Sequence, residues 1–292
     1  MIMKDEFTKQ WITENALTII PRYEKGVLTL RALHYQLVSI GMTNSINHYK
    51  RVVNAMIEAR WNGLVDFDTF SDLDRSMIGN TSFIPTDIEN RVEESQKQVR
   101  LWMTVYNKNR WENQEVYPEV FIEKKALQGV FSSVCERWNV ALGACKGYPS
   151  LTFLYEASLR IKDALYYGKK PIILYFGDYD PSGEDIPRAI QENLERLDVP
   201  EVEVRRIALM ESQVTAWSLP PAPIKVGDSR SASWDGLGQV ELDAVEPKKL
   251  QALCDEAIMD VFDYDLYDTL MRNEETEREE FTRRMKEFAA SL

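Results

Sequence analysis

The stretch Pro171-Ile-Ile-Leu-Tyr-Phe-Gly-Asp178-Tyr-Asp180-Pro-Ser-Gly183 joins an unbroken apolar run to two acids, a proline and a glycine. A continuous apolar run is typical of a parallel strand that is covered on both faces. In open α/β sheets, ligands bind at the carboxyl ends of such strands. We therefore expect a buried strand over residues 171–177, with Asp178 and Asp180 exposed at an active-site edge.

The two acids suit a hard cation such as Mg²⁺. Acids at positions i and i+2 point to the same side of an extended chain, and Mg²⁺ prefers oxygen ligands. Two other interpretations stay open. The acids could belong to a turn that only caps the helix starting near Pro181, or to a nucleophilic Asp-x-Asp of the phosphatase type, although Ser182-Gly183 follows where that motif would carry a threonine.

Strands and helices alternate on both sides of this stretch. We expect strands over residues 120–123, 139–145, 171–177 and 202–209. We expect helices over residues 126–138, 150–167 and 183–197. This order predicts an α/β fold with a parallel, doubly wound sheet and right-handed crossovers.

A further acid, Glu123, ends the first of these strands and is followed by Lys124. Taken alone, Glu123 also fits a solvated acid at the start of a helix. If the first and third strands are parallel neighbours, however, their carboxyl ends bring Glu123 close to Asp178 and Asp180. Three acids and a lysine then share one edge of the sheet.

The N-terminal part of the chain has helical periodicity. We expect helices over residues 5–20, 29–38 and 46–60, and residues 64–70 alternate like a strand. Helices followed by a small β element are typical of a winged helix-turn-helix. The second helix of that motif enters the major groove of DNA, which would make Lys50, Arg51 and Arg60 contacts to phosphates or bases. The alternative is an ordinary helical subdomain with basic residues on its wet face.

The charge distribution supports a nucleic-acid face only at this end. The 292 residues carry a net charge of −12, which argues against a generic nucleic-acid binder. Residues 1–63 hold eight Lys and Arg against five Asp and Glu. The basic end is therefore the candidate DNA-binding face.

The composition argues against zinc-binding, disulfide-rich, membrane-spanning and secreted classes of protein. With three Cys, no Cys-x-x-Cys spacing and two His, a zinc site or a disulfide framework is not expected. No apolar run approaches 18 residues and the N-terminus lacks the layout of a signal peptide. We expect a cytoplasmic protein without a membrane partner.

Two motifs of this chain resemble a known family. They are Phe121-Ile-Glu123-Lys-Lys-Ala-Leu127 and Phe176-Gly-Asp178-Tyr-Asp180-Pro-Ser-Gly183. A lone Glu after one strand and an Asp-x-Asp after a later one resemble the Toprim domain of topoisomerases, primases and certain nucleases. The closing Asp-Pro-x-Gly looks most like the A subunit of topoisomerase VI and its meiotic double-strand-break relatives, and the wider pattern resembles phage-encoded Toprim proteins.

The resemblance extends to the N-terminal helices. In the topoisomerase family a winged helix precedes the Toprim domain and carries a nucleophilic Tyr four residues after an Arg, a spacing that Arg31-Ala-Leu-His34-Tyr35 fits. The family usually shows two adjacent aromatics where this chain has His34-Tyr35. Its A subunit also works with a separate ATPase subunit, which this chain does not contain.

What the resemblance implies is a Mg²⁺-dependent enzyme, with Mn²⁺ as the alternative metal, that cleaves double-stranded DNA. Glu123, Asp178 and Asp180 would bind the metal, and Lys124 would join the catalytic group. Tyr35 would attack the phosphate and remain covalently attached, with Arg31 stabilising the charge. That Tyr works with the metal of the partner subunit, which implies a homodimer, with a separate ATPase subunit as a further partner.

Two later residues extend this set. Asp243 could enlarge the acidic site and Arg230 could bind a phosphate, whereas a helix cap and a surface loop are the alternatives. Two other functions also stay open: a Toprim endonuclease that activates water, with Tyr35 structural, and a catalytically inactive DNA-binding regulator.

The expected organisation has four segments. A winged-helix domain with residues 1–71 is followed by a linker region, 72–118. A Toprim domain with a parallel Rossmann-like sheet covers residues 119–250. An acidic helical segment, 251–292, ends the chain.

The basic face yields a first prediction. The double substitution Lys50→Glu, Arg51→Glu should weaken binding to duplex DNA and reduce the slope of log affinity against log salt by about 2, because about one counterion is released per phosphate contact. Electrophoretic retardation over a salt series measures this slope. The matched control, Arg284→Glu with Lys286→Glu, makes the same charge change in the acidic C-terminal segment. Equal affinities of the two variants at every salt concentration would place the DNA face elsewhere.

Overall fold

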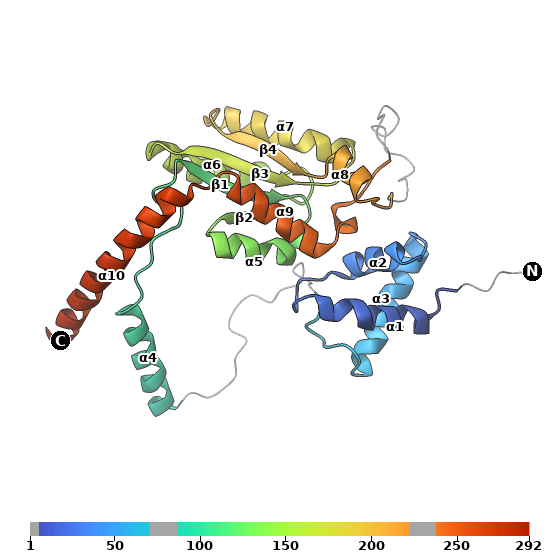
Figure 1. Cartoon of the computed structure of the whole chain (residues 1–292), viewed down its shortest axis with the longest axis horizontal. Coiled ribbons are helices and arrows are strands. Elements are labelled where there is room, and N and C mark those ends of the chain that lie inside the picture. The colour runs from blue at the N-terminus through green and yellow to red at the C-terminus, as the bar shows by residue number, and fades with distance from the viewer. Residues whose placement is uncertain (1–5, 71–86, 222–237, 292) are drawn as a thin grey trace, which may run out of the picture. The chain divides into compact units, whose positions relative to one another are not determined.

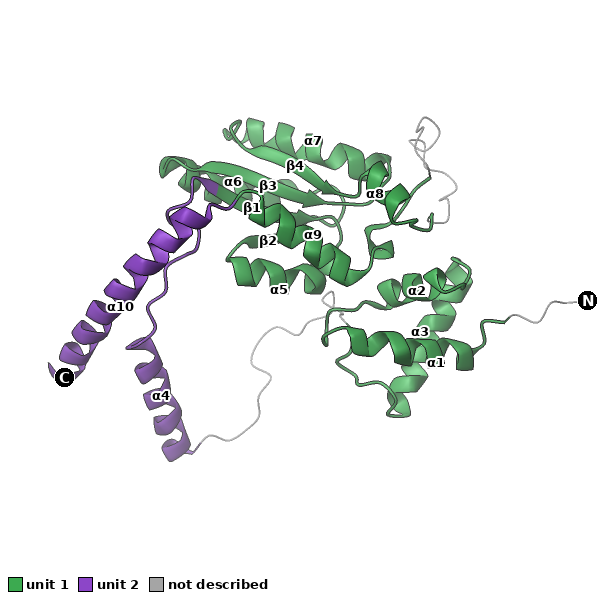
Figure 2. Ribbon diagram, in the orientation of Figure 1, with its two compact units in different colours: residues 1–75, 117–261 green, residues 76–116, 262–292 purple. Residues whose placement is uncertain are grey.

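The computed structural model describes residues 6–70, 87–221 and 238–291. The chain forms two compact units (Figure 2): residues 1–75 with 117–261, and residues 76–116 with 262–292. The first unit thus combines the N-terminal helices with the α/β part of the chain. The second unit consists of most of the expected linker region and the C-terminal helix.

Three helices open the first unit. They are α1 (Lys9–Ile19), α2 (Leu30–Ser39) and α3 (Ile46–Trp61), with a short 3₁₀ turn, η1 (Ile20–Arg22), after the first. Each begins at a hydroxyl side chain that accepts a hydrogen bond from a backbone N–H of the first turn: Thr8, Thr29 and Ser45. Their apolar faces share one core, which includes Ile12, Leu33 and Met56.

The prediction of a strand over residues 64–70 is wrong. This segment is a series of turns, and Phe70 alone makes an isolated parallel bridge, to Leu28. Val65 and Phe70 are buried in the helical core, while Leu64 and Phe67 are exposed. Val65 and Phe70 are five positions apart and would point to opposite faces of a strand, so the turns, and not a strand, bring both side chains into the same core.

The expected α/β class and parallel sheet are confirmed. Four parallel strands have the order β2-β1-β3-β4 (Figure 1). They are β1 (Val116–Ile122), β2 (Ala141–Ala144), β3 (Lys170–Phe176) and β4 (Glu203–Ala208). The central strand β3 is buried from Pro171 to Phe176, as its continuous apolar run predicts.

Helices cover both faces of this sheet (Figure 1). On one face, α6 (Leu151–Tyr166) and α7 (Pro181–Arg196) pack against the strand residues Phe121, Ile173 and Tyr175. On the other face lie α5 (Gln128–Trp138) and α9 (Pro247–Met259), and the Phe131 and Phe176 rings meet at 4.8 Å between centroids. Three short elements complete the unit: η2 (Lys125–Leu127), α8 (Glu211–Ala216) and η4 (Leu242–Ala244).

The second unit contains α4 (Ile88–Trp102) and the long α10 (Tyr264–Ser291). The segment after α4 is tied to α10 by the backbone N–H of Lys108, which donates to Glu274 Oε2 at 2.7 Å. The Tyr106 and Phe281 rings lie 5.3 Å apart. Of the helices that the structure describes, none combines the length and apolar composition needed to cross a membrane.

The turn into α7 depends on a glycine. A Cβ atom at Gly183 would lie 2.1 Å from the carbonyl oxygen of Asp178. Gly183→Ala should therefore lower the free energy of unfolding by about 1–3 kcal/mol, the usual range for an overpacked site. Thermal or urea unfolding measures the loss. Ser182→Ala, one residue earlier on the same helix, adds no atom and should leave stability nearly unchanged; equal stability of the two variants would contradict the close approach.

Candidate active site

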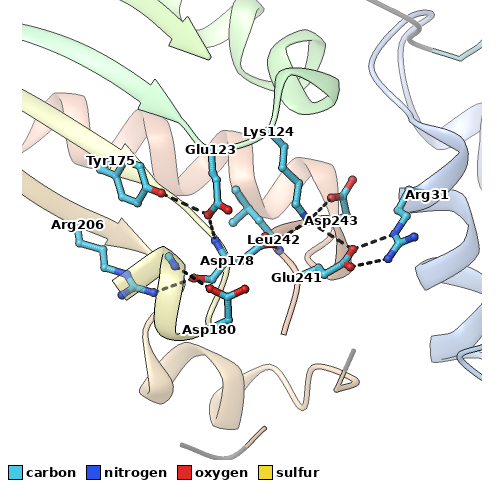
Figure 3. A network of polar contacts seen from close by, with 11 residues as sticks. Arg31, Glu123, Lys124, Tyr175, Asp178, Asp180, Arg206, Glu241, Leu242 and Asp243 are labelled. Atoms are coloured by element: carbon cyan, nitrogen blue, oxygen red, sulfur yellow. Dashed lines mark hydrogen bonds and ion pairs between the residues drawn. The ribbon is translucent and has the colours of Figure 1, made fainter. Parts of the chain in front are cut away.

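Glu123 and Asp178 lie at one edge of the sheet because they follow the neighbouring strands β1 and β3 (Figure 3). The Asp178 backbone N–H donates to Glu123 Oε2 at 2.8 Å, and the Tyr175 hydroxyl donates to the same oxygen at 3.3 Å. Gly177 makes this approach possible, since a Cβ there would lie 2.8 Å from Glu123 Oε2. The two acids are thus joined through the backbone of the strand end.

The expectation that Asp178 is exposed is wrong: only 7% of the residue is accessible. Its Oδ1 accepts from the Leu242 backbone N–H at 2.8 Å, and its Oδ2 lies 3.0 Å from Lys124 Nζ. The physical reason is the segment before η4, which pairs with the strand end through an isolated antiparallel bridge between Tyr179 and Val240. This later segment covers the edge that the strand alone would leave open.

Asp180 has a different environment. Its Oδ1 accepts from the Gly183 backbone N–H at 2.7 Å, so it caps helix α7. The helix-cap interpretation therefore describes Asp180 but not Asp178. The charge of Asp180 nevertheless acts on Glu123, because it helps to raise the pKa of that carboxyl group.

Lys124 is the centre of an ion cluster that contains Asp178, Asp243 and Glu241. Its Nζ lies 3.0 Å from Asp178 Oδ2, 3.0 Å from Asp243 Oδ2 and 3.3 Å from Glu241 Oε2. Burial by itself would lower the pKa of Lys124, but these three charges raise it above its ordinary value. The structure thus brings both Lys124 and Asp243 to the strand-end acids.

Burial disfavours the charged forms of the two strand-end acids. It raises the pKa of Glu123 above its ordinary value, against the lowering effect of the hydrogen bond from the Asp178 amide. It raises the pKa of Asp178 to about 7, although Lys124 opposes this rise. Two buried carboxylates next to each other are the kind of group that a bound cation stabilises.

Arg31 reaches the same cluster from helix α2. Its Nε and Nη2 donate to the two oxygens of Glu241 at 2.8 and 2.5 Å. Such a bidentate pair is a strong, geometrically specific contact. Burial by itself would raise the pKa of Glu241, but Lys124 and Arg31 hold it below its ordinary value.

Tyr35 lies one helical turn after Arg31, whose guanidinium carbon is 5.8 Å from the Tyr35 ring centroid and 5.3 Å from that of Tyr49. Tyr35 is 2% exposed. Among the described residues, no group meets its hydroxyl in hydrogen-bonding geometry. Burial and the charge of Glu241 raise the pKa of Tyr35 to about 12. In this state the phenol is therefore held neutral.

Two site residues escaped the sequence reasoning, Glu241 and Arg206. Glu241 stands two residues before Asp243, the same spacing as Asp178 and Asp180, so a search for paired acids would have found it. Arg206 lies inside β4, and its Nη2 donates to the carbonyl oxygens of Asp178 and Leu209 at 3.0 and 2.7 Å. No local pattern distinguishes this arginine from an exposed strand residue.

The expected DNA contacts have different surroundings. Lys50 and Arg51 are exposed on α3. Arg60 is half-buried, with its guanidinium carbon 4.9 Å from the Phe70 ring centroid, so this side chain packs on the core of the helical part. Arg230 lies outside the described residues.

The donor chemistry of the strand edge fits a hard cation. In the ranges 6–70, 87–221 and 238–291, no three acidic, His or Cys side chains stand together as a ready metal-ligand group. Both carboxylate oxygens of Asp178 are already contacted, one by the Leu242 amide and the other by Lys124. The backbone amides that bind Glu123 and Asp180 contact only one oxygen of each carboxylate. Carboxylate oxygens of this kind suit Mg²⁺ or Mn²⁺, and a rearrangement of Lys124 would release an oxygen of Asp178.

Comparisons of the chain with protein-family models, with curated proteins and with solved structures found no match.

The raised pKa of Asp178 predicts a pH dependence of stability in EDTA. Between the ordinary pKa of 3.8 and about 7, the folded protein keeps a proton that the unfolded chain has released. The free energy of unfolding should therefore fall as pH rises through this window. Asp178→Asn removes the titrating group and with it this loss of stability. The free energy of unfolding of Asp178→Asn minus that of the parent should therefore be larger at pH 8 than at pH 5, by on the order of 2 kcal/mol.

Urea unfolding at several pH values measures this difference. Asp163→Asn, on the exposed face of α6, controls for the loss of one negative charge. A constant difference between parent and Asp178→Asn from pH 5 to pH 8 would show that burial does not perturb this carboxylate.

Proposed function

We propose that this chain is a Mg²⁺-dependent enzyme that cleaves a strand of DNA, and that its two parts correspond to the winged-helix and Toprim domains that the sequence resembles. One observation supports this most strongly. A continuous series of ion pairs runs from Arg31 through Glu241 and Lys124 to Asp178 (Figure 3). It connects the helix that carries Tyr35 with the acids at the strand ends.

The metal would be held by Glu123, Asp178 and Asp180. When bound, Mg²⁺ or Mn²⁺ would neutralise the scissile phosphate and stabilise the leaving oxygen. Lys124 supports the same charge distribution, because its ammonium group already balances the acids of the cluster. The resulting site combines a negative lining with cations that can face a phosphate.

Arg31 would bind the phosphate on the side of α2. A guanidinium group recognises a phosphate through the same two-pronged geometry that it uses for a carboxylate. Glu241 occupies that position in this structure. An incoming phosphate would take the place of Glu241 on Arg31, which would free Glu241 to accept the proton of the Tyr35 phenol.

Tyr35 would then attack the phosphorus atom. A bond forms between its oxygen and the phosphorus, and the bond to one sugar oxygen breaks. That oxygen takes up a proton from Glu241 or water, which leaves a covalent phosphotyrosine and a free hydroxyl end. The resemblance implies that Tyr35 works with the metal of the partner subunit, whereas the ion pairs from Arg31 to Asp178 lie within one chain, so in this proposal Tyr35 acts with the metal of its own chain. The homodimer and the separate ATPase subunit that the resemblance implies belong to the same proposal. They would supply a second cleavage site and the energy for strand passage.

A second candidate is a Toprim endonuclease in which water is the nucleophile. The burial of Tyr35 and its pKa of about 12 favour this version, because both keep the phenol neutral and inaccessible. The acids at the strand ends would have the same role, and Tyr35 would be a core residue of α2. Free hydroxyl and phosphate ends would result, with no protein attached.

Supercoiled plasmid with Mg²⁺ distinguishes the two versions. In the transesterase, denaturation after the reaction should trap protein on DNA, and protease should release the cut strand. Tyr35→Phe removes only one oxygen and should slow cleavage by at least about 100-fold, or about 2.7 kcal/mol in transition-state free energy. DNA binding and melting temperature should stay as in the parent.

Two variants make this assay specific. Tyr49→Phe removes the hydroxyl of the other ring beside Arg31 and should cut like the parent. Glu123→Gln should abolish cleavage in either version. Cleavage by Tyr35→Phe at the parent's rate, with free ends, would establish the water-activating nuclease, and retardation of plasmid without any cut would leave only a DNA-binding function.

A further inference from the structure

Helix α4 carries an apolar stripe although it buries none of its residues. Positions separated alternately by four and three residues form this stripe: Ile88, Val92, Ser95, Val99 and Trp102. Ile88 is 73% exposed and Trp102 is 65% exposed, and the two valines are about half exposed. This alternation is the heptad spacing of helices that pack against one another in coiled coils.

A helix of this length needs a partner for its apolar face. Isolated helices of up to about 15 residues are marginal in water, and in proteins most helical stability comes from packing of an amphipathic face. The 15 residues of α4 include four positions on the stripe that lower intrinsic helix propensity: the β-branched Ile88, Val92 and Val99 and the aromatic Trp102. The stripe is therefore suited to an interface.

The charges of α4 are divided between its two halves. The first half, with its cap, contains Asp87, Glu89, Glu93 and Glu94 against the single base Arg91. The second half contains Lys97 and Arg100 and no acid. A parallel pair of such helices would bring like halves together, whereas an antiparallel pair would set each acidic half against a basic half.

The row of residues along one side of the apolar stripe, its flank, is also acidic in its first half and basic in its second half. Glu89, Glu93, Gln96 and Arg100 follow the same spacing of four and three residues beside the apolar positions. In an antiparallel pair this flank faces its own copy, so with the centre of the stripe on the two-fold axis Glu89 of one chain lies toward Arg100 of the other. The surface is complementary to itself, which is the requirement for a two-fold symmetric interface.

We propose that α4 docks in antiparallel orientation onto α4 of a second copy of this chain, with Ser95 near the two-fold axis. The stripe supplies the apolar seam and the divided charges select the orientation. The proposal concerns the second compact unit (Figure 2) and does not depend on the chemistry proposed for the first.

Sedimentation of the full chain tests the partner. The parent should form a dimer within the range of about 1 to about 100 µM. Glu89→Lys with Glu93→Lys makes the whole flank basic, and Gln96→Glu with Arg100→Glu makes it acidic. Each double variant should be a monomer by itself, and an equal mixture of the two should form a heterodimer.

The variant with all four substitutions is the matched control. It reverses the two halves of the flank and keeps their complementarity, so it should again form a homodimer with the helix content of the parent by circular dichroism. A parent that stays monomeric at about 100 µM, or a dimer that persists in both double variants, would overturn the proposal and leave the stripe to another protein or another segment of this chain.

Cross-linking tests the orientation. The three native cysteines are buried, so an introduced thiol on α4 reports on its own surroundings. Ser95→Cys should form a disulfide between two copies under mild oxidation. Ile88→Cys should not, because antiparallel copies separate the two positions by most of the helix length, about 20 Å. Efficient cross-linking through Ile88→Cys would require the parallel arrangement and contradict the proposal.

Discussion

The ammonium group of Lys124 holds together three carboxylates from different parts of the chain. Asp178 comes from the end of β3, while Glu241 and Asp243 come from the segment around η4. Buried acids next to one another repel and are costly to ionise, so they require a cation between them. Without this lysine, the segment around η4 would bring negative charge to an edge that is already negative.

The same interaction links the α/β part to the helical part of the first unit. Glu241 shares its carboxylate between Lys124 and Arg31, and Arg31 belongs to the helix that carries Tyr35. The polar contacts around the strand edge are therefore mutually dependent. A phosphate that replaced Glu241 on Arg31 would alter the charge balance of Lys124 and, through it, that of Asp178.

This arrangement accounts for two opposing features of the site. The acids are buried and their ionisation is disfavoured, which is typical of a site where charge is held ready for a ligand. Tyr35 is buried and neutral, which is typical of a core residue. The burial of Asp178 follows from the segment around η4, which lies over the strand edge. A covalent mechanism requires Tyr35 to become accessible, whereas activation of water at the acids does not involve Tyr35.

Local sequence patterns were enough to predict the α/β class, the strands and helices on either side of β3 and, for parallel neighbouring strands, the meeting of Glu123 and Asp178 at one edge. These features depend on local periodicity and on the parallel order of strands, which a chain carries in its own pattern. The strand expected over residues 64–70 does not form, because the turns of this segment bring Val65 and Phe70 into one helical core and leave Phe67 exposed.

The burial and pairing of each charged group, in contrast, depend on contacts between segments that are distant in the sequence. Whether Asp178 is exposed depends on a segment more than 60 residues later, which supplies the Leu242 amide across 64 positions of sequence. The same holds for the partners of Arg31, which is 210 residues from Glu241, and for Arg60, which packs on Phe70. Local patterns state which side chains are present at a strand end, but solvation and pairing energies depend on what the rest of the chain places around them.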